Sequence, residues 1–88
     1  MKTRQEKISE PRVDRKAVAR RIREIRGFDL TQAEFARKLG VSQAMLSKYE
    51  GGQNTPTIDI LLKLKIFSGR SIDWIVTGEE VRAPAADR

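Results

Sequence analysis

The sequence contains neither cysteine nor histidine among its 88 residues. The absence of cysteine excludes disulfide bonds, thiolate zinc sites and cysteine nucleophiles. The absence of histidine excludes imidazole catalysis and histidine-containing metal sites. No apolar run approaches the roughly 18 residues of a membrane span, and no hydrophobic segment follows the charged start. We therefore expect a cytoplasmic protein with no metal, no cofactor and no membrane association.

The length predicts one small domain, since 88 residues are too few for a binding domain fused to a separate sensor domain. Hydrophobic residues make up 39% of the chain, which is enough for a single core. The acids and hydroxyls form no recognisable nucleophile–base pair, and no glycine-rich loop is placed to cradle a phosphate. An enzyme is therefore not expected.

The charge is unevenly distributed along the chain. Lysine and arginine number 18 against 12 acids, which gives a net charge of +6 and a pI near 10.2. Residues 1–26 hold ten basic and four acidic side chains, whereas Gly27 to Arg88 holds eight of each. This imbalance predicts an anionic partner, although a solubilising basic leader has the same composition. We expect a flexible basic arm at 1–13, a folded domain at 14–78 and a flexible tail at 79–88.

Capping residues and hydrophobic periodicity predict an all-α fold. Five helices are expected, each preceded by a hydroxyl or acidic side chain and followed by a polar or glycine-containing stretch. Their predicted ranges are 14–26, 31–39, 43–50, 58–67 and 72–76. Thr31 and Glu34 fit a capping box, which makes the second start the most clearly marked.

The second and third helices are separated only by Gly40, Val41 and Ser42. A three-residue turn containing glycine favours a crossing of about 90–120°, the geometry of a helix-turn-helix. Apolar residues stand where the interior of such a unit needs them: Phe35, Leu39, Val41, Leu46 and Tyr49. A short helical hairpin with no role in DNA binding would share this geometry.

The segment TQAEFARKLGVSQAMLSKYEGGQNTPTIDILLKL, followed by SIDWIVTGE, resembles the lambda-repressor-like, Cro-type (XRE) helix-turn-helix family. The resemblance covers about residues 15–79. It implies a compact five-helix domain that binds double-stranded DNA as a two-fold homodimer, with each third helix in a major groove.

This family resemblance also implies a function. A sequence-specific transcriptional regulator is expected, most simply a repressor of a palindromic operator, cytoplasmic and associated with the nucleoid when bound. An antitoxin-type regulator that binds a toxin, or a protein-interaction module built on the same fold, is the alternative.

The resemblance also implies which residues contact DNA. Gln43 matches a base-reading glutamine, whose amide can bind adenine N6 and N7 together. The expected base-contacting residues are Gln43, Ala44, Ser47 and Lys48. The expected phosphate-contacting residues are Gln32, Ser42, Gln53, Asn54, Thr55, Arg20 and Arg23. Ser42 is expected to act first as a helix cap, and the loop at 52–55 to offer backbone N–H groups as well as side chains.

Glu50 ends the third helix, where an acidic group would oppose DNA or read cytosine. The family pattern instead pairs this glutamate with an arginine of the first helix, for which Arg21 is the best match. We therefore predict a partly buried Arg21–Glu50 ion pair.

The fourth helix departs from the family pattern. A stripe of Ile58, Leu61 and Leu62 is interrupted by Lys65 and Ser68, while other apolar residues fall on the remaining faces. We predict a dimer interface formed by Ile66, Phe67, Trp74 and Val76. A rotated helix that buries Phe67 in the core is the alternative.

The basic residues that precede the first helix are too scattered to form a defined base reader. We expect the arm to contact phosphates without choosing a sequence.

Overall fold

The computed structural model describes residues 12–80, which form five helices and contain no strand. These are α1 (Arg15–Arg26), α2 (Gln32–Leu39), α3 (Gln43–Glu50), α4 (Ile58–Ser68) and α5 (Ile72–Thr77). The predicted all-α fold is confirmed. Residues 1–11 and 81–88, most of the expected arm and tail, lie outside the described residues, so these two segments stay predictions. Within residues 12–80 no helix is both long enough and apolar enough to cross a bilayer.

Every helix begins with a side chain that accepts a hydrogen bond from the backbone N–H three residues further on. The capping residues are Asp14, Thr31, Ser42, Thr57 and Ser71. Each bond satisfies one of the free donors of a first turn and stabilises its helix by about 1 kcal/mol. At α2 the bond is reciprocal, because the Glu34 carboxylate accepts from the N–H of Thr31 at 2.9 Å. Because of these caps, the first residue of each helix can be predicted from the sequence.

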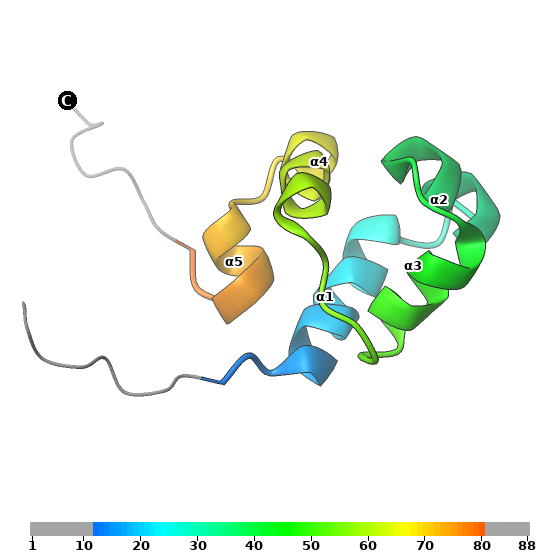
Figure 1. Ribbon diagram of the computed structural model, residues 1–88. Helices are drawn as coiled ribbons and strands as arrows, with labels where there is room; N and C mark the ends of the chain where they lie inside the picture. Colours follow the sequence, from blue (N-terminus) through cyan, green and yellow to red (C-terminus); the bar gives the residue numbers. More distant parts are fainter. Residues whose placement is uncertain (1–11, 81–88) are drawn as a thin grey trace, which may run out of the picture.

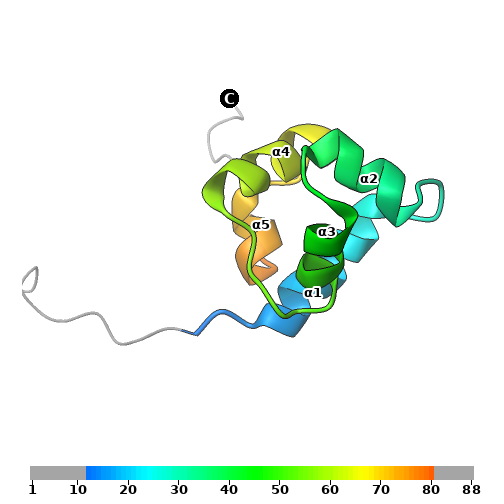
Figure 2. The same ribbon diagram turned by 45° about the vertical axis from the view of Figure 1, so that its right-hand side comes forward.

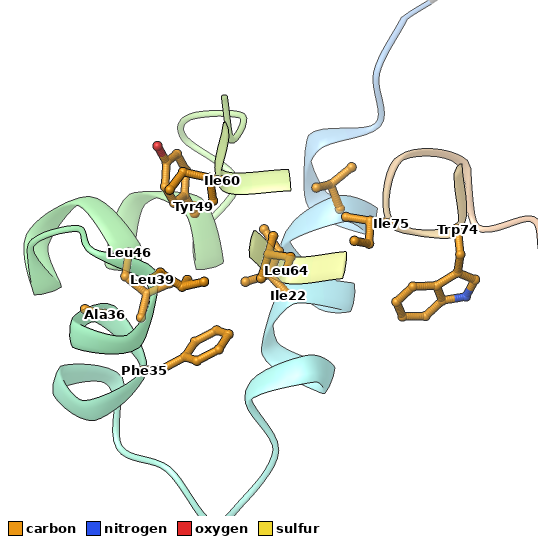
Figure 3. Close-up of a cluster of buried hydrophobic side chains, with 11 residues drawn as sticks. Ile22, Phe35, Ala36, Leu39, Leu46, Tyr49, Ile60, Leu64, Trp74 and Ile75 are labelled. Carbon is orange, nitrogen blue, oxygen red and sulfur yellow. The ribbon is translucent and has the colours of Figure 1, made fainter. Parts of the chain in front are cut away.

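The helices enclose one apolar core. α1 contacts α3, α4 and α5, while α2 contacts α3 and α4. Figure 1 shows α2 and α3 side by side at one end of the molecule and α5 at the other, and Figure 2 brings α3 to the front. The largest fully buried side chains come from all five helices: Ile22, Phe35, Leu39, Leu46, Leu64 and Ile75. Figure 3 shows Phe35, Leu39 and Leu46 directed toward Ile22 and Leu64.

The turn between α2 and α3 is fixed by a glycine and by two hydrogen bonds. Gly40 has φ 74° and ψ 29°, a left-handed conformation that costs glycine little. The N–H of Val41 donates to the Ala36 carbonyl at 3.0 Å, and the Lys63 ammonium of α4 donates to the Leu39 carbonyl at 3.0 Å. The orientation of α3 on α2 is therefore set locally and tied to α4.

α4 buries only part of the stripe of Ile58, Leu61 and Leu62, because Leu61 alone of the three packs against the core. Ile60 and Leu64 are buried, whereas Ile58 is 79% exposed and Leu62 is 48% exposed. A core stripe that follows Leu61 would have turned Lys65 toward the core one turn later. The Ile60–Leu64 register instead continues to the ring of Phe67, and helix α4 can therefore present an unbroken apolar stripe.

Candidate nucleic-acid interface

α3 has a buried inner face and a polar outer face. Leu46, Tyr49 and Glu50 are buried against the rest of the molecule. The exposed side chains are Gln43, Ala44, Ser47 and Lys48. This exposed set is the one that the sequence predicts to read bases, and the structure gathers it on one helix face. Its contact with bases stays a prediction.

The N-termini of α2 and α3 are linked by their first side chains. The Nε2 of Gln43 donates to the Oε1 of Gln32, with the two atoms 3.4 Å apart. The N–H groups of a first turn carry partial positive charge and suit an anionic oxygen. The Ser42 hydroxyl accepts from the N–H of Met45 at 3.0 Å, so its cap role is present in the structure. Phosphate contacts of Gln32 and Ser42 stay predictions.

The loop after α3 exposes the side chains of Gln53, Asn54 and Thr55. Its backbone N–H groups are not free as expected, because those of Gln53 and Asn54 both donate to the Lys48 carbonyl, at 3.0 and 3.3 Å. The last carbonyls of a helix need donors, and the loop supplies them. For Gln53 and Asn54 that part of the prediction is wrong, and their side chains are what remains for a phosphate. Arg15 lines the same shallow hollow as these side chains, a placement that the sequence reading missed.

Glu50 pairs with Arg26 and not with Arg21, which corrects the predicted ion pair. The Arg26 Nε lies 2.8 Å from one carboxylate oxygen of Glu50, and the Arg26 Nη2 lies 3.0 Å from the other. These hydrogen bonds hold the pKa of Arg26 above its ordinary value. Arg26 also donates to the Leu30 carbonyl at 3.1 Å, so one side chain joins the end of α1, the following turn and the end of α3. Only the last turn of α1 comes close enough to Glu50 for this bidentate geometry.

Two other arginines of α1 donate to backbone carbonyls near helix ends. Arg21 is directed toward α5, where it donates to the Ile75 carbonyl at 3.0 Å. Arg23 donates to the backbone carbonyl of Glu50 at the end of α3. Arg20 is exposed. Because a guanidinium has five N–H donors, Arg23 has further donors for a phosphate. Phosphate contacts of Arg20 and Arg23 stay predictions.

The predicted dimer interface is only partly exposed. Ile66 is 74% exposed and Phe67 is 44% exposed, with the Phe67 ring 5.3 Å from that of Phe35. Val76 is half-buried. Trp74 departs from the prediction, because it is 9% exposed and the guanidinium of Arg70 covers its ring at 3.6 Å. The indole therefore completes the core of its own chain and is not available to a second one.

Two curated proteins are similar to this chain over part of their length. The HTH-type transcriptional activator BcrR of Enterococcus faecalis is 36% identical over 55 residues, which are 62% of this chain and 27% of BcrR. An uncharacterized HTH-type transcriptional regulator of Haemophilus influenzae is 36% identical over 47 residues, 53% of this chain and 20% of that protein. The chain thus spans about a quarter or less of the curated relatives it matches.

A solved structure extends the likeness to the fold. The P22 c2 repressor, in complex with synthetic operator 9T in the presence of Tl+, matches with a TM-score of 0.65 and 28% identity, over 70% of this chain and 96% of that one. The model of the Helix-turn-helix family matches residues 20–75. This span contains α2, the turn, α3 and α4 in full. The chain therefore belongs to the helix-turn-helix family of DNA-binding transcriptional regulators, in its lambda-repressor-like, Cro-type form.

Proposed function

We propose that this chain binds double-stranded DNA as a homodimer and represses transcription by occluding a palindromic operator. The observation that carries the proposal is the outer face of α3, which is exposed, polar and free of acidic groups. A helix of this kind fits the major groove, where each base pair presents a distinct pattern of donors and acceptors. The excess of basic residues in the first 26 positions supplies attraction to phosphates.

The roles of individual residues follow from their chemistry. The Gln43 amide would bind adenine N6 and N7, and Ala44 would contact a thymine methyl group. Lys48 would donate to guanine O6 and N7 or to a phosphate. Gln32, at the start of α2, would bind a backbone phosphate and so fix the register of α3 on the duplex. The side chains of the loop after α3 would do the same on the other side of the groove.

A second copy of this chain is the proposed occupant of the exposed apolar surface around Ile66. The P22 c2 repressor was solved on an operator, and helix-turn-helix dimers place their reading helices one duplex turn apart. Ile66 and Phe67 offer exposed apolar surface, whereas the half-buried Val76 lines a separate hollow with Val18 and Leu61. Sedimentation of Ile66→Asp and Phe67→Asp is expected to give folded monomers. Ile58→Asp, at the opposite end of α4, is the control that stays dimeric, and dimers in all three would contradict the interface.

Selection from a library of random duplexes, followed by a salt titration, tests DNA binding. A palindromic motif is expected, with log K falling against log salt by about 0.9 for each phosphate contacted. Recovery of no motif would overturn the proposal. Transcription from a promoter that overlaps the motif should fall as protein is added. A rise would contradict repression and would agree with the named role of BcrR as an activator.

Binding of a partner protein is the second candidate function, and the exposed apolar side chains of α4 favour it. An antitoxin-type regulator or an interaction module would use that surface to bind another protein such as a toxin. The two candidates separate in the same experiments, because an interaction module that has lost DNA binding would return no motif. An antitoxin-type regulator would return a motif and also bind its partner through Ile66.

A further inference from the structure

Glu50 is the one charged residue that is buried among residues 12–80, and its carboxylate makes three hydrogen bonds between side chains. Two come from Arg26, and the third comes from the Nε2 of Gln32 at 2.9 Å. Arg26 and Glu50 belong to α1 and α3, while Gln32 begins α2. One buried carboxylate therefore joins the three helices behind the outer face of α3.

An ionised carboxylate has acceptors only, so it fixes the orientation of any amide beside it. The Gln32 amide must turn its NH₂ group toward Glu50, and its oxygen is then directed elsewhere. That oxygen accepts from the Nε2 of Gln43 at 3.4 Å. The direction of hydrogen bonding is therefore set from the buried end: Arg26 and Gln32 donate to Glu50, and Gln43 donates to Gln32.

The same constraint reaches the groups that Gln43 presents to the exterior. One N–H of its Nε2 is used on Gln32, which leaves one N–H donor and the Oε1 acceptor side by side. In the major groove adenine presents N7 as an acceptor and the N6 amino group as a donor, whereas guanine presents two acceptors, N7 and O6. The outward pair on Gln43 therefore complements adenine and leaves guanine with an acceptor facing an acceptor.

We propose that Glu50 is a positioning residue that makes Gln43 select adenine over guanine, acting through the amide of Gln32. The inference rests on the proposed function, because it assumes that Gln43 faces a base. It differs from a purely structural role of the Arg26–Glu50 pair, which would change stability and affinity without changing which base is preferred.

Replacement of Glu50 by glutamine tests the direction of the chain of hydrogen bonds. An amide at position 50 can donate as well as accept, so Gln32 is free to turn its oxygen inward and its NH₂ group toward the Oε1 of Gln43. Gln43 then presents two N–H donors outward, the arrangement that suits guanine. Glu50→Gln should therefore lower the adenine-to-guanine preference by about tenfold, the loss of roughly one good bidentate pair.

The experiment compares two duplexes that differ at one base pair. Random-duplex selection with the unaltered chain and with Gln43→Ala identifies the adenine whose preference depends on Gln43. Dissociation constants are then measured for the duplex with adenine and the duplex with guanine at that position. The matched control is Glu24→Gln, which removes the same charge from an exposed residue of α1 and should leave the adenine-to-guanine ratio unchanged.

The outcomes are distinct. Equal weakening of both duplexes by Glu50→Gln overturns the proposal, and so does a position read by Gln43 that does not prefer adenine. Failure of the unaltered chain to select any motif refutes the proposed function instead. The Gln32 side-chain amide resonances in DNA-free protein give a separate readout, and they should move in Glu50→Gln but not in Glu24→Gln.

A second variant keeps the proposal testable if Glu50→Gln folds poorly. Gln32→Met interrupts the same chain of hydrogen bonds and leaves the Arg26–Glu50 pair in place. A lost phosphate contact would weaken both duplexes equally, whereas a lost positioning role lowers their ratio by about tenfold. An unchanged ratio in this variant would contradict the role assigned to Glu50.

Discussion

α3 and α4 differ in the side chains that they expose. The buried side of α3 includes the carboxylate of Glu50, while its exposed side is mainly polar. The buried side of α4 is apolar, and its exposed side carries large hydrophobic residues at a spacing of four: Ile58, Leu62 and Ile66. α3 thus has a mainly polar exposed face, whereas α4 exposes large hydrophobic side chains as well as burying others.

The proposed function gives a reason for this difference. Base edges offer hydrogen-bonding groups, so a reading helix needs polar side chains held in fixed orientations. The buried carboxylate of Glu50 costs desolvation free energy, and its three donors offset that cost while orienting Gln32. A protein surface is matched by apolar side chains, as at the core of an interface. α3 thus suits DNA, and α4 suits a second polypeptide.

The largest expected effect is a loss of stability that distinguishes the buried face of α4 from its exposed face. Leu64→Ala removes a fully buried side chain and should lower the free energy of unfolding by about 3 kcal/mol, since a cavity remains in the core. For a domain of this size the loss corresponds to about 15 °C in Tm. Leu62→Ala makes the same chemical change on the exposed face and should cost less than about 1 kcal/mol. Thermal unfolding by circular dichroism measures both, and equal losses would mean that the assigned register of α4 is wrong.

The helix boundaries of this fold were predictable because they are encoded locally. Thr31 and Ser42 each bond within their own first turn, and the left-handed Gly40 ends α2, so no distant residue is needed to place them. The register of α4 was not predictable in this way. Both of its faces are apolar, so the sequence does not show whether Leu62 or Leu64 faces the core. That outcome depends on the packing of Phe67 and on the side chains of α1 and α5 that contact α4.

The candidate site shows the same limit. The exposed side chains of α3 could be predicted because they follow from helix spacing and from a motif within 20 residues. The partner of Glu50 depends on how far α1 extends past α3, and Arg21 and Arg26 differ by little more than one turn. The chain gives no local signal for that choice.

The next prediction concerns the buried charge on the inner side of α3. Glu50→Ala leaves the Arg26 guanidinium and the Gln32 amide without their acceptor and should lower the free energy of unfolding by about 2–3 kcal/mol. Arg26 keeps 23% of its side chain exposed, so water brings the loss below the roughly 3–5 kcal/mol that breaking a fully buried pair costs. Glu24→Ala, at an exposed acid of α1, is the matched control and should change stability little. Urea denaturation compares them, and similar midpoints would show that the pair adds nothing to the fold.

A smaller effect should distinguish the exposed face of α3, proposed to contact bases, from the exposed arginine Arg20 of α1, proposed to contact phosphates. Gln43→Ala is expected to reduce discrimination at one base position by about 1–2 kcal/mol, since a bidentate contact is lost. Arg20→Ala should weaken binding to every duplex alike and reduce the slope of log K against log salt by about 0.9. Competition binding with single-base variants of the selected motif measures the first effect, and a salt titration measures the second. If Arg20→Ala changed base preference, the division between sequence reading and phosphate attraction would fail.

The smallest expected effect lies where α2 begins, because α3 and α4 start with a hydroxyl cap alone while α2 also uses a carboxylate. Hydrogen bonds from the backbone and side chain of Thr31 hold the pKa of Glu34 below its ordinary value. A lowered pKa in the folded state means that this contribution is complete above the unfolded value, near pH ~4.3, and is lost as pH falls through the folded pKa. The protection of the first-turn amides of α2, which is the slowing of their exchange relative to that of an unstructured peptide at the same pH, should therefore fall on acidification below about pH 4.

The control for that experiment is Glu34→Gln, which can still complete a capping box but carries no titrating group. In this variant the first turn of α2 should exchange at a rate that no longer responds specifically to acid. The first turns of α3 and α4, capped by Ser42 and Thr57, serve as internal references in both proteins. Equal loss of protection at all three helix starts in the unaltered chain would mean that acid destabilises the whole domain. The carboxylate of Glu34 would then make no separate contribution to the start of α2.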